Sequence, residues 1–91
     1  MPKGTYKLNS KNAARITVAG RSVHLGTFDT EVEAGEVYDT ACMVLGRGLS
    51  AYNSVHTPIS QGQFQRIASV LLTKNAITPE RLEELGKLTW Q

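Results

Sequence analysis

The junction at residues 23–30 constrains the fold more than any other stretch of the chain. Apolar and polar residues alternate in its first half, which predicts a strand with one apolar face. Thr30 and Glu33 then have the spacing of a capping box, which marks the start of a helix. Apolar residues follow at helical spacing, and Gly46 predicts the helix end. A strand that leads directly into such a helix needs a sheet on which the helix can lie.

The residues before this junction predict a β-hairpin and a short first strand over residues 4–8. Ala19-Gly20 forms the expected two-residue turn. The resulting register pairs Arg15 with His24 and Thr17 with Ser22, and it pairs Ala14 with Leu25. It sorts the side chains by face, because alternate residues of a strand point to opposite sides. The apolar face consists of Ala14, Ile16, Val23 and Leu25, and the polar face consists of Arg15, Thr17, Ser22 and His24.

The predicted helix would hold the sheet through an apolar stripe, and it contains a glycine, Gly35. Glycine costs about 1 kcal/mol within a helix relative to alanine. Gly35 is therefore either a tolerated cost or, as we favour, the site of a close approach between helix and sheet. Met43 and Val44 are expected on the helix surface or against the C-terminal part of the chain. The stripe consists of Ala34, Val37, Tyr38, Ala41 and Leu45.

Residues 54–91 predict two further short helices, capped by Ser60 and Thr78. The fold class is therefore α+β: a three-stranded antiparallel sheet packed on one α-helix, followed by a C-terminal pair of short helices. We divide the chain into a domain over residues 4–53 and a helical extension over residues 54–91. The extension either caps the domain within one chain or joins two chains in a homodimer. Its apolar residues are Phe64, Ile67, Ala68 and Leu71, followed by Leu82, Leu85 and Trp90.

Charge is segregated along the chain although the net charge is only +2. Residues 1–28 hold five basic residues and no acidic one, whereas residues 29–46 hold five acidic residues and no basic one. This pattern predicts a basic sheet layer backed by an acidic helix. The basic side would face a polyanion, and the acidic side would face solvent or a cationic partner.

Composition argues against several classes of protein. A single cysteine, Cys42, excludes an internal disulfide, and with His24 and His56 it lacks the spacing of a zinc site. No run of about 18 apolar residues is present, so we expect no membrane span, and the first residues lack the apolar region of a signal peptide. We expect no catalytic residues, no metal and no cofactor. Tyr38-Asp39 is interpreted as a core tyrosine beside a carboxylate that binds the sheet or a loop.

The residues of the hairpin and helix resemble the APETALA2/ethylene-response-factor type of DNA-binding domain. The resemblance covers residues 4–53. It rests on Ala-Ala-Arg-Ile-Thr-Val at 13–18, on His-Leu-Gly-Thr-Phe-Asp-Thr at 24–30, and on Ala-x-x-x-Tyr-Asp-x-Ala at 34–41. The sequence of these segments is most similar to the version of the domain in bacterial and phage His-Asn-His homing endonucleases. No His-Asn-His motif is present in residues 54–91, so the resemblance does not extend to cutting DNA.

The resemblance implies that the exposed sheet face enters the major groove of duplex DNA. Arg15, Thr17, Ser22 and His24 would then contact bases or phosphates, and Tyr6 and Lys7 would contribute from the first strand. Lys11 and Arg21 would position the DNA backbone. The first strand has fewer arginines than the plant domains, which predicts weak, salt-sensitive binding by a monomer.

Two functions from different classes follow from these observations. One is a sequence-specific DNA-binding module, in a transcription regulator or a stand-alone relative of the endonuclease module. The other is a small protein-binding inhibitor, of phage type, that grips a host nucleic-acid enzyme. The expected location is the cytoplasm and nucleoid in a bacterium or phage, and the nucleus in a eukaryote.

Overall fold

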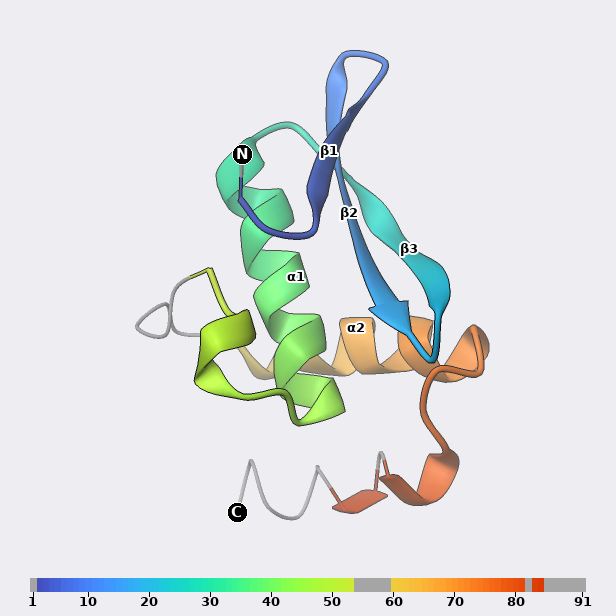
Figure 1. The fold of residues 1–91 in the computed structure, drawn as a ribbon. Coiled ribbons are helices and arrows are strands. Elements are labelled where there is room, and N and C mark those ends of the chain that lie inside the picture. Colours follow the sequence, from blue (N-terminus) through green and yellow to red (C-terminus); the bar gives the residue numbers. More distant parts are fainter. Residues whose placement is uncertain (1, 54–59, 82, 85–91) are drawn as a thin grey trace.

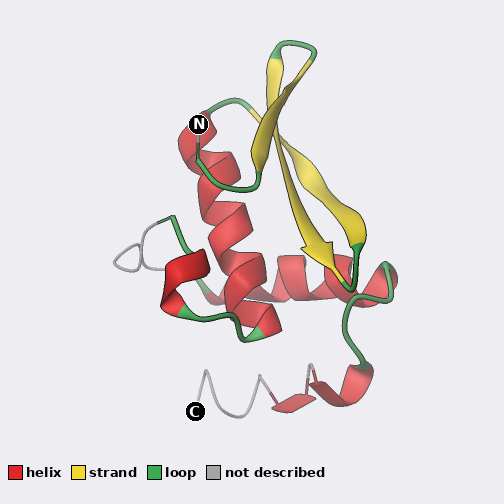
Figure 2. Ribbon diagram, viewed as in Figure 1, coloured by secondary structure: helices red, strands yellow, loops and turns green. Residues whose placement is uncertain are grey.

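The computed structural model describes residues 2–53, 60–81 and 83–84, and these form a sheet with helices on one side (Figure 1). Strands β1 (Thr5–Leu8), β2 (Lys11–Val18) and β3 (Arg21–Phe28) form an antiparallel sheet in the order β1-β2-β3. Helix α1 (Glu31–Leu45) lies along the sheet, and α2 (Gln61–Thr73) crosses below it (Figure 2). The short 3-10 helix η1 (Leu49–Ala51) lies between them in sequence. The predicted α+β class is confirmed.

The β2–β3 hairpin has the predicted two-residue turn. Ala19 and Gly20 have φ values of 52° and 77°, the combination that matches the twist of a tight hairpin. The pairs Thr17–Ser22 and Arg15–His24 form as predicted. The next pair is wrong, because Ala14 pairs with Gly26 and leaves Leu25 as the extra residue of a β-bulge.

Helix α1 begins and ends where the sequence predicts. The Thr30 hydroxyl accepts from the Glu33 amide at 3.1 Å and lies 3.1 Å from the Glu33 carboxylate. Gly46 ends the helix with a φ of 72°. The prediction for Gly35 is wrong: a Cβ there would lie 3.2 Å from Pro2 and 3.6 Å from the Asn53 amide. The close neighbours of this glycine are therefore the start of the chain and the loop after η1, and they do not belong to the sheet.

Residue Asn53 ties the start of the chain to the loop after η1. Its side-chain oxygen accepts from the Lys3 amide at 2.6 Å, and its side-chain nitrogen donates to the Lys3 carbonyl at 3.1 Å. Its own amide donates to the Asp39 carboxylate at 2.7 Å, so the carboxylate binds a loop, as predicted. These bonds bring residues 3 and 53 side by side against α1.

Helix α2 shares one core with the sheet and α1. Ser60 caps α2 as predicted, and the Gln63 side chain donates to the Thr40 hydroxyl of α1 at 2.9 Å. The predicted apolar stripe of α2 is buried against the same chain, so the surface considered for a dimer is already occupied. Val44 is fully buried in this core whereas Leu45 is half-buried, which corrects the predicted order of these two residues. The core contains Ile16, Val23, Leu25, Ala34, Val37, Ala41, Val44, Phe64, Ile67, Ala68 and Leu71, among others.

The segment after α2 is described only in part. Residues 79–81 and 83–84 are helical, and the Arg81 amide donates to the Thr78 hydroxyl at 3.2 Å, which confirms the predicted cap. The expected contacts of Leu82, Leu85 and Trp90 lie outside the described residues. None of the helices in the described part of the chain is long and apolar enough to cross a bilayer.

Candidate nucleic-acid interface

The side of the sheet that faces away from α1 carries a row of polar side chains. We call it the outer sheet face. Helix α1 covers the opposite side, where Asn12, Ala14 and Ile16 of β2 are buried. The outer sheet face is supported from behind by a packed core, which holds its backbone in place. Its polar residues are Tyr6, Lys11, Arg15, Thr17, Ser22, His24 and Thr27.

Tyr6, Arg15 and His24 form a cluster at the centre of this face, one from each strand. The Arg15 guanidinium lies 4.7 Å from the centre of the Tyr6 ring, a cation–π contact. The Tyr6 hydroxyl lies 3.2 Å from Nδ1 of His24 and forms a hydrogen bond with it. An exposed arginine normally samples many rotamers, and these contacts restrict where the Arg15 side chain can point. The cluster therefore presents a guanidinium in a defined orientation.

Thr27 belongs to the outer sheet face because of the β-bulge, and it was not among the predicted contacts. The extra residue at Leu25 changes the phase of β3, so that Thr27 pairs with Ala13 and Phe28 turns toward the helix side. Simple alternation from Val23 would have placed them the other way round. The signal was present in the sequence: the apolar spacing lengthens from two residues to three between Leu25 and Phe28, with a glycine in the gap.

Two of the predicted DNA contacts lie elsewhere, and a third is paired with a carboxylate. Lys7 pairs with Asn12 and therefore lies on the helix side of the sheet. Arg21 also lies toward the helices, and its guanidinium donates to the Lys74 carbonyl at the end of α2 at 2.7 Å. Lys11 is on the outer sheet face but forms a salt bridge with Asp29.

The prediction that the basic residues gather on one face of the sheet is therefore wrong. Lys3 binds the carbonyls of Ser50 and Tyr52 at 2.7 and 3.2 Å. Of the five basic residues in the first 28, Arg15 alone sits on the outer sheet face without a carboxylate partner among the described residues. The basic residues are close together in the sequence, but they do not gather on one face of the structure. Those on the strands are divided between the two faces of the sheet, and some bind the loop near η1 or the end of α2.

The Lys11–Asp29 pair reduces the positive charge at one end of the outer sheet face. The Lys11 side chain hydrogen-bonds the carboxylate and thereby lowers the pKa of Asp29, while Asp29 raises the pKa of Lys11. Both side chains are exposed, at 56% and 77%, so the pair is screened by solvent and open to competition. A phosphate that approaches Lys11 has to compete with Asp29.

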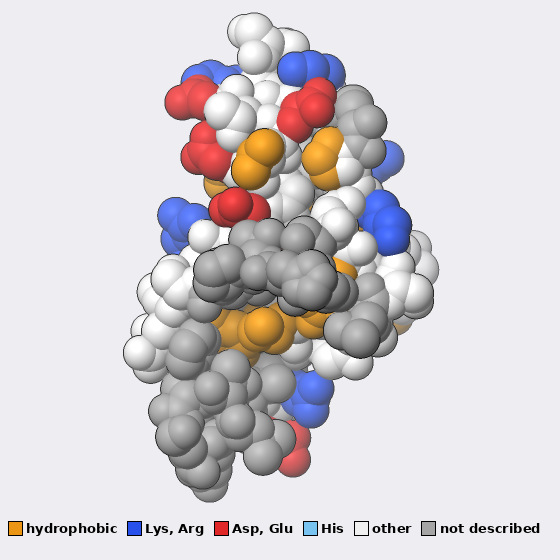
Figure 3. All heavy atoms as spheres, turned by 90° about the vertical axis from the view of Figure 1, so that its left-hand side faces the viewer, with side chains coloured by type: hydrophobic (Ala, Val, Ile, Leu, Met, Phe, Trp, Pro, Cys, Tyr) orange, Lys and Arg blue, Asp and Glu red, His pale blue; other side chains and the backbone are white. Residues whose placement is uncertain are grey.

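The opposite side of the molecule is acidic. Glu31 and Glu33 are exposed in the first turn of α1, where the helix dipole favours negative charge. Figure 3 shows acidic side chains gathered on the upper part of this surface. The two sides of the protein therefore differ in charge, although the positive side is weaker than the sequence predicts.

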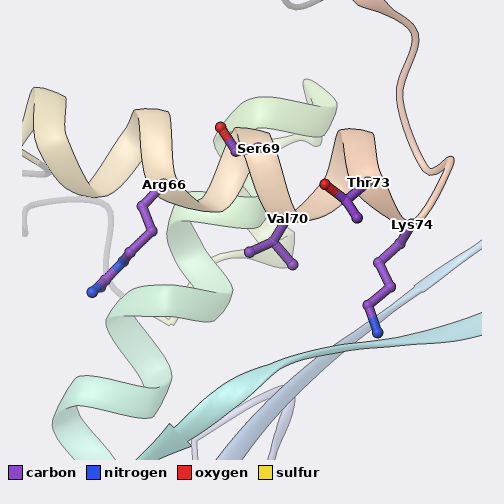
Figure 4. Close-up of a pocket in the computed structure, with 5 residues that line it drawn as sticks. All are labelled: Arg66, Ser69, Val70, Thr73 and Lys74. Carbon is purple, nitrogen blue, oxygen red and sulfur yellow. The ribbon is translucent and has the colours of Figure 1, made fainter.

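A hollow of about 460 Å³ lies along α2 and is lined by Arg66, Ser69, Val70, Thr73 and Lys74. Figure 4 shows these side chains on α2, next to α1 and the strands. Four of them belong to α2 and Lys74 follows it directly, on the helix side of the sheet. This hollow is thus separate from the outer sheet face.

The fold and the outer sheet face define a small module that presents a polar three-stranded sheet on a helical support. No family model matches the chain. A segment of 45 residues, half of the chain, is 42% identical to an ethylene-responsive transcription factor-like protein of Arabidopsis thaliana. The match covers 20% of that plant protein, so the chain spans only a small part of the length of this relative. The likeness concerns an ethylene-response-factor type of segment and no more of the plant protein.

Proposed function

We propose that the protein is a sequence-specific DNA-binding module that reads the major groove with its outer sheet face. The observation that carries the proposal is the cluster of Tyr6, Arg15 and His24, with three hydroxyl side chains around it. Arginine bonds guanine through two acceptors in the major groove, and hydroxyls bond bases or phosphates. No acidic residue belongs to this face as defined above.

The partial similarity to a plant transcription factor-like protein supports this proposal, since its name indicates a regulator of transcription. A regulatory role in transcription, in the nucleus of a eukaryotic source, is part of the proposal. The similarity to the homing-endonuclease module stays a prediction from the sequence of residues 13–30. The proposal assigns no catalytic activity to the chain.

Substitution of Arg15 tests the proposal. After selection of a preferred duplex from a random pool, we expect Arg15→Ala to weaken binding by about 1–3 kcal/mol and to relax the preference at one base pair. Arg66→Ala is the matched control, because it removes the same charge from α2. Unchanged DNA affinity in a folded Arg15→Ala variant would contradict the proposal.

A protein-binding inhibitor is the second candidate, and the acidic surface of α1 favours it. Glu31 and Glu33 could bind a cationic partner, while on the outer sheet face Arg15 alone has no carboxylate partner among the described residues. Retention on duplex DNA at low salt separates the two candidates, because the inhibitor does not require it. Absence of retention would favour the inhibitor.

A further inference from the structure

The first strand is too short to cover the full edge of β2. Strand β1 begins at Thr5, opposite Ala14, and the Arg15 amide makes the last connection by donating to the Gly4 carbonyl at 2.8 Å. In the part of the chain that the structure describes, no strand lies beside residues 16–18 of β2 on this edge. A hollow of about 280 Å³ lies there, lined by Gly4, Thr5, Arg15, Ile16, Thr17, Tyr38 and Arg47.

Arg47 reaches this hollow from the far end of α1. Gly46 turns the chain in the left-handed conformation, and the Arg47 guanidinium then donates to the Thr17 carbonyl on the open edge. Arg47 also lies near Tyr38. Burial raises the pKa of the Tyr38 hydroxyl, and the positive charge of Arg47 partly offsets this rise. One of its donors is thus fixed to the strand, and a guanidinium has five.

Arg15 lines the same hollow, with its guanidinium on the ring of Tyr6. Two arginines therefore line one small space at the margin of the outer sheet face. Neither has a carboxylate partner among the residues the structure describes. Lys7 and Arg21 add no positive charge to the outer sheet face, because they lie on the helix side of the sheet. Arg47, which follows α1, supplies positive charge at the margin of that face instead.

We propose that this hollow binds one phosphate of the DNA backbone, with Arg47 as its principal contact. The inference rests on the proposed DNA-binding function and adds a backbone site to it. A duplex seated on the outer sheet face carries its sugar-phosphate strands past the margins of that face. Guanidinium groups match the geometry of phosphate oxygens, and such contacts fix the register of a protein on DNA.

The test compares Arg47→Ala with the wild-type protein on selected and unrelated duplexes over a range of salt concentrations. We expect the variant to bind both kinds of duplex about tenfold more weakly, as for a lost charged hydrogen bond. The slope of log affinity against log salt should fall by about one contact. Arg47→Lys should keep the slope, since the charge remains. Arg66→Ala, on α2, is the matched control for loss of one positive charge.

A second measurement guards against a change in fold, because Arg47 also binds the Thr17 carbonyl. Duplexes with single neutral methylphosphonate linkages are scanned against both proteins. One position should weaken the wild-type protein and have no effect on Arg47→Ala. If every position affects both proteins equally, or if Arg47→Ala binds like Arg66→Ala, the phosphate site is wrong while DNA binding stands. If the wild-type protein binds no duplex, the proposed function fails and this site fails with it.

Discussion

At the scale of single residues, Tyr6 connects the other two members of the central cluster. Its ring supports the Arg15 guanidinium and its hydroxyl contacts His24. Tyr6→Phe keeps the ring, so we expect DNA affinity to change little. Tyr6→Ala removes the support and should cost at least the value of an exposed cation–π contact, about 0.5–1 kcal/mol. Titration of a fluorescent duplex measures both, and equal losses in the two variants would show that the ring does not orient Arg15.

Asp29 is expected to oppose DNA binding through its salt bridge with Lys11. Asp29→Asn removes the competing carboxylate, so affinity for every duplex should rise and the salt slope should steepen by about one contact. Glu31→Gln is a suitable control, because it removes an exposed acidic residue from the first turn of α1. If both substitutions raise affinity equally, the effect comes from net charge and not from the release of Lys11.

Part of the candidate site could be predicted residue by residue. Alternation placed Arg15 and His24 on one face because side-chain direction in a strand is a local property. The positions of Arg21 and Arg47 could not be predicted in this way. Arg21 binds a residue that lies 53 positions away in the sequence, and Arg47 binds one that lies 30 positions away. Both contacts therefore depend on how the helices pack.

At the scale of the elements, the β2–β3 turn stores strain. Ala19 has a φ of 52°, a conformation that costs an L-residue roughly 1–2 kcal/mol. Ala19→Asn creates the preferred Asn-Gly turn and should raise the free energy of unfolding by about 1 kcal/mol. Urea unfolding measures the gain. Ala19→Val should have the opposite effect, because a branched side chain fits this conformation poorly, and a loss in the asparagine variant would contradict the turn geometry.

The bulge in β3 marks the limit of prediction for an element. The hairpin register followed from the turn length as far as Arg15 and His24. Beyond that pair, alternation no longer applies, because one extra residue reverses the facing of everything that follows. Gly26 has a φ of 139°, which explains why a glycine stands at this point.

At the scale of the whole molecule, Phe64 tests whether α2 belongs to the same folding unit as the sheet. It is 1% exposed in a core that also holds Ile16 and Val44. We expect Phe64→Ala to lower the free energy of unfolding by about 3–5 kcal/mol. Circular dichroism of helix and sheet should show a single transition at a lower denaturant concentration.

Val32→Ala provides the control for this prediction, because Val32 is 68% exposed on α1. Its effect should stay within about 0.5 kcal/mol. If Phe64→Ala instead melts α2 alone and leaves the sheet signal unchanged, α2 is an appendage and the shared core is wrong.

The sequence predicted the apolar stripe of α2 but not its partner. Phe64 and Leu71 mark a helix face that must be covered, and helical periodicity alone cannot distinguish a second chain from the same chain. Val44 is buried in the core that α1 and α2 share, whereas the sequence analysis favoured Leu45 for the core. The buried face of α1 therefore includes Val44 in the place predicted for Leu45, one residue along the helix.

The bonds between Lys3 and Asn53 have a consequence for how such a segment can be combined with other proteins. They bring the two ends of the sheet-and-helix segment to one point, on the side away from the outer sheet face. A segment whose ends meet can be spliced into a surface loop of a host protein without separating the host's own strands. Chain added before residue 2 would likewise leave from the helical side. Fusion partners joined there should leave the sheet open to its target.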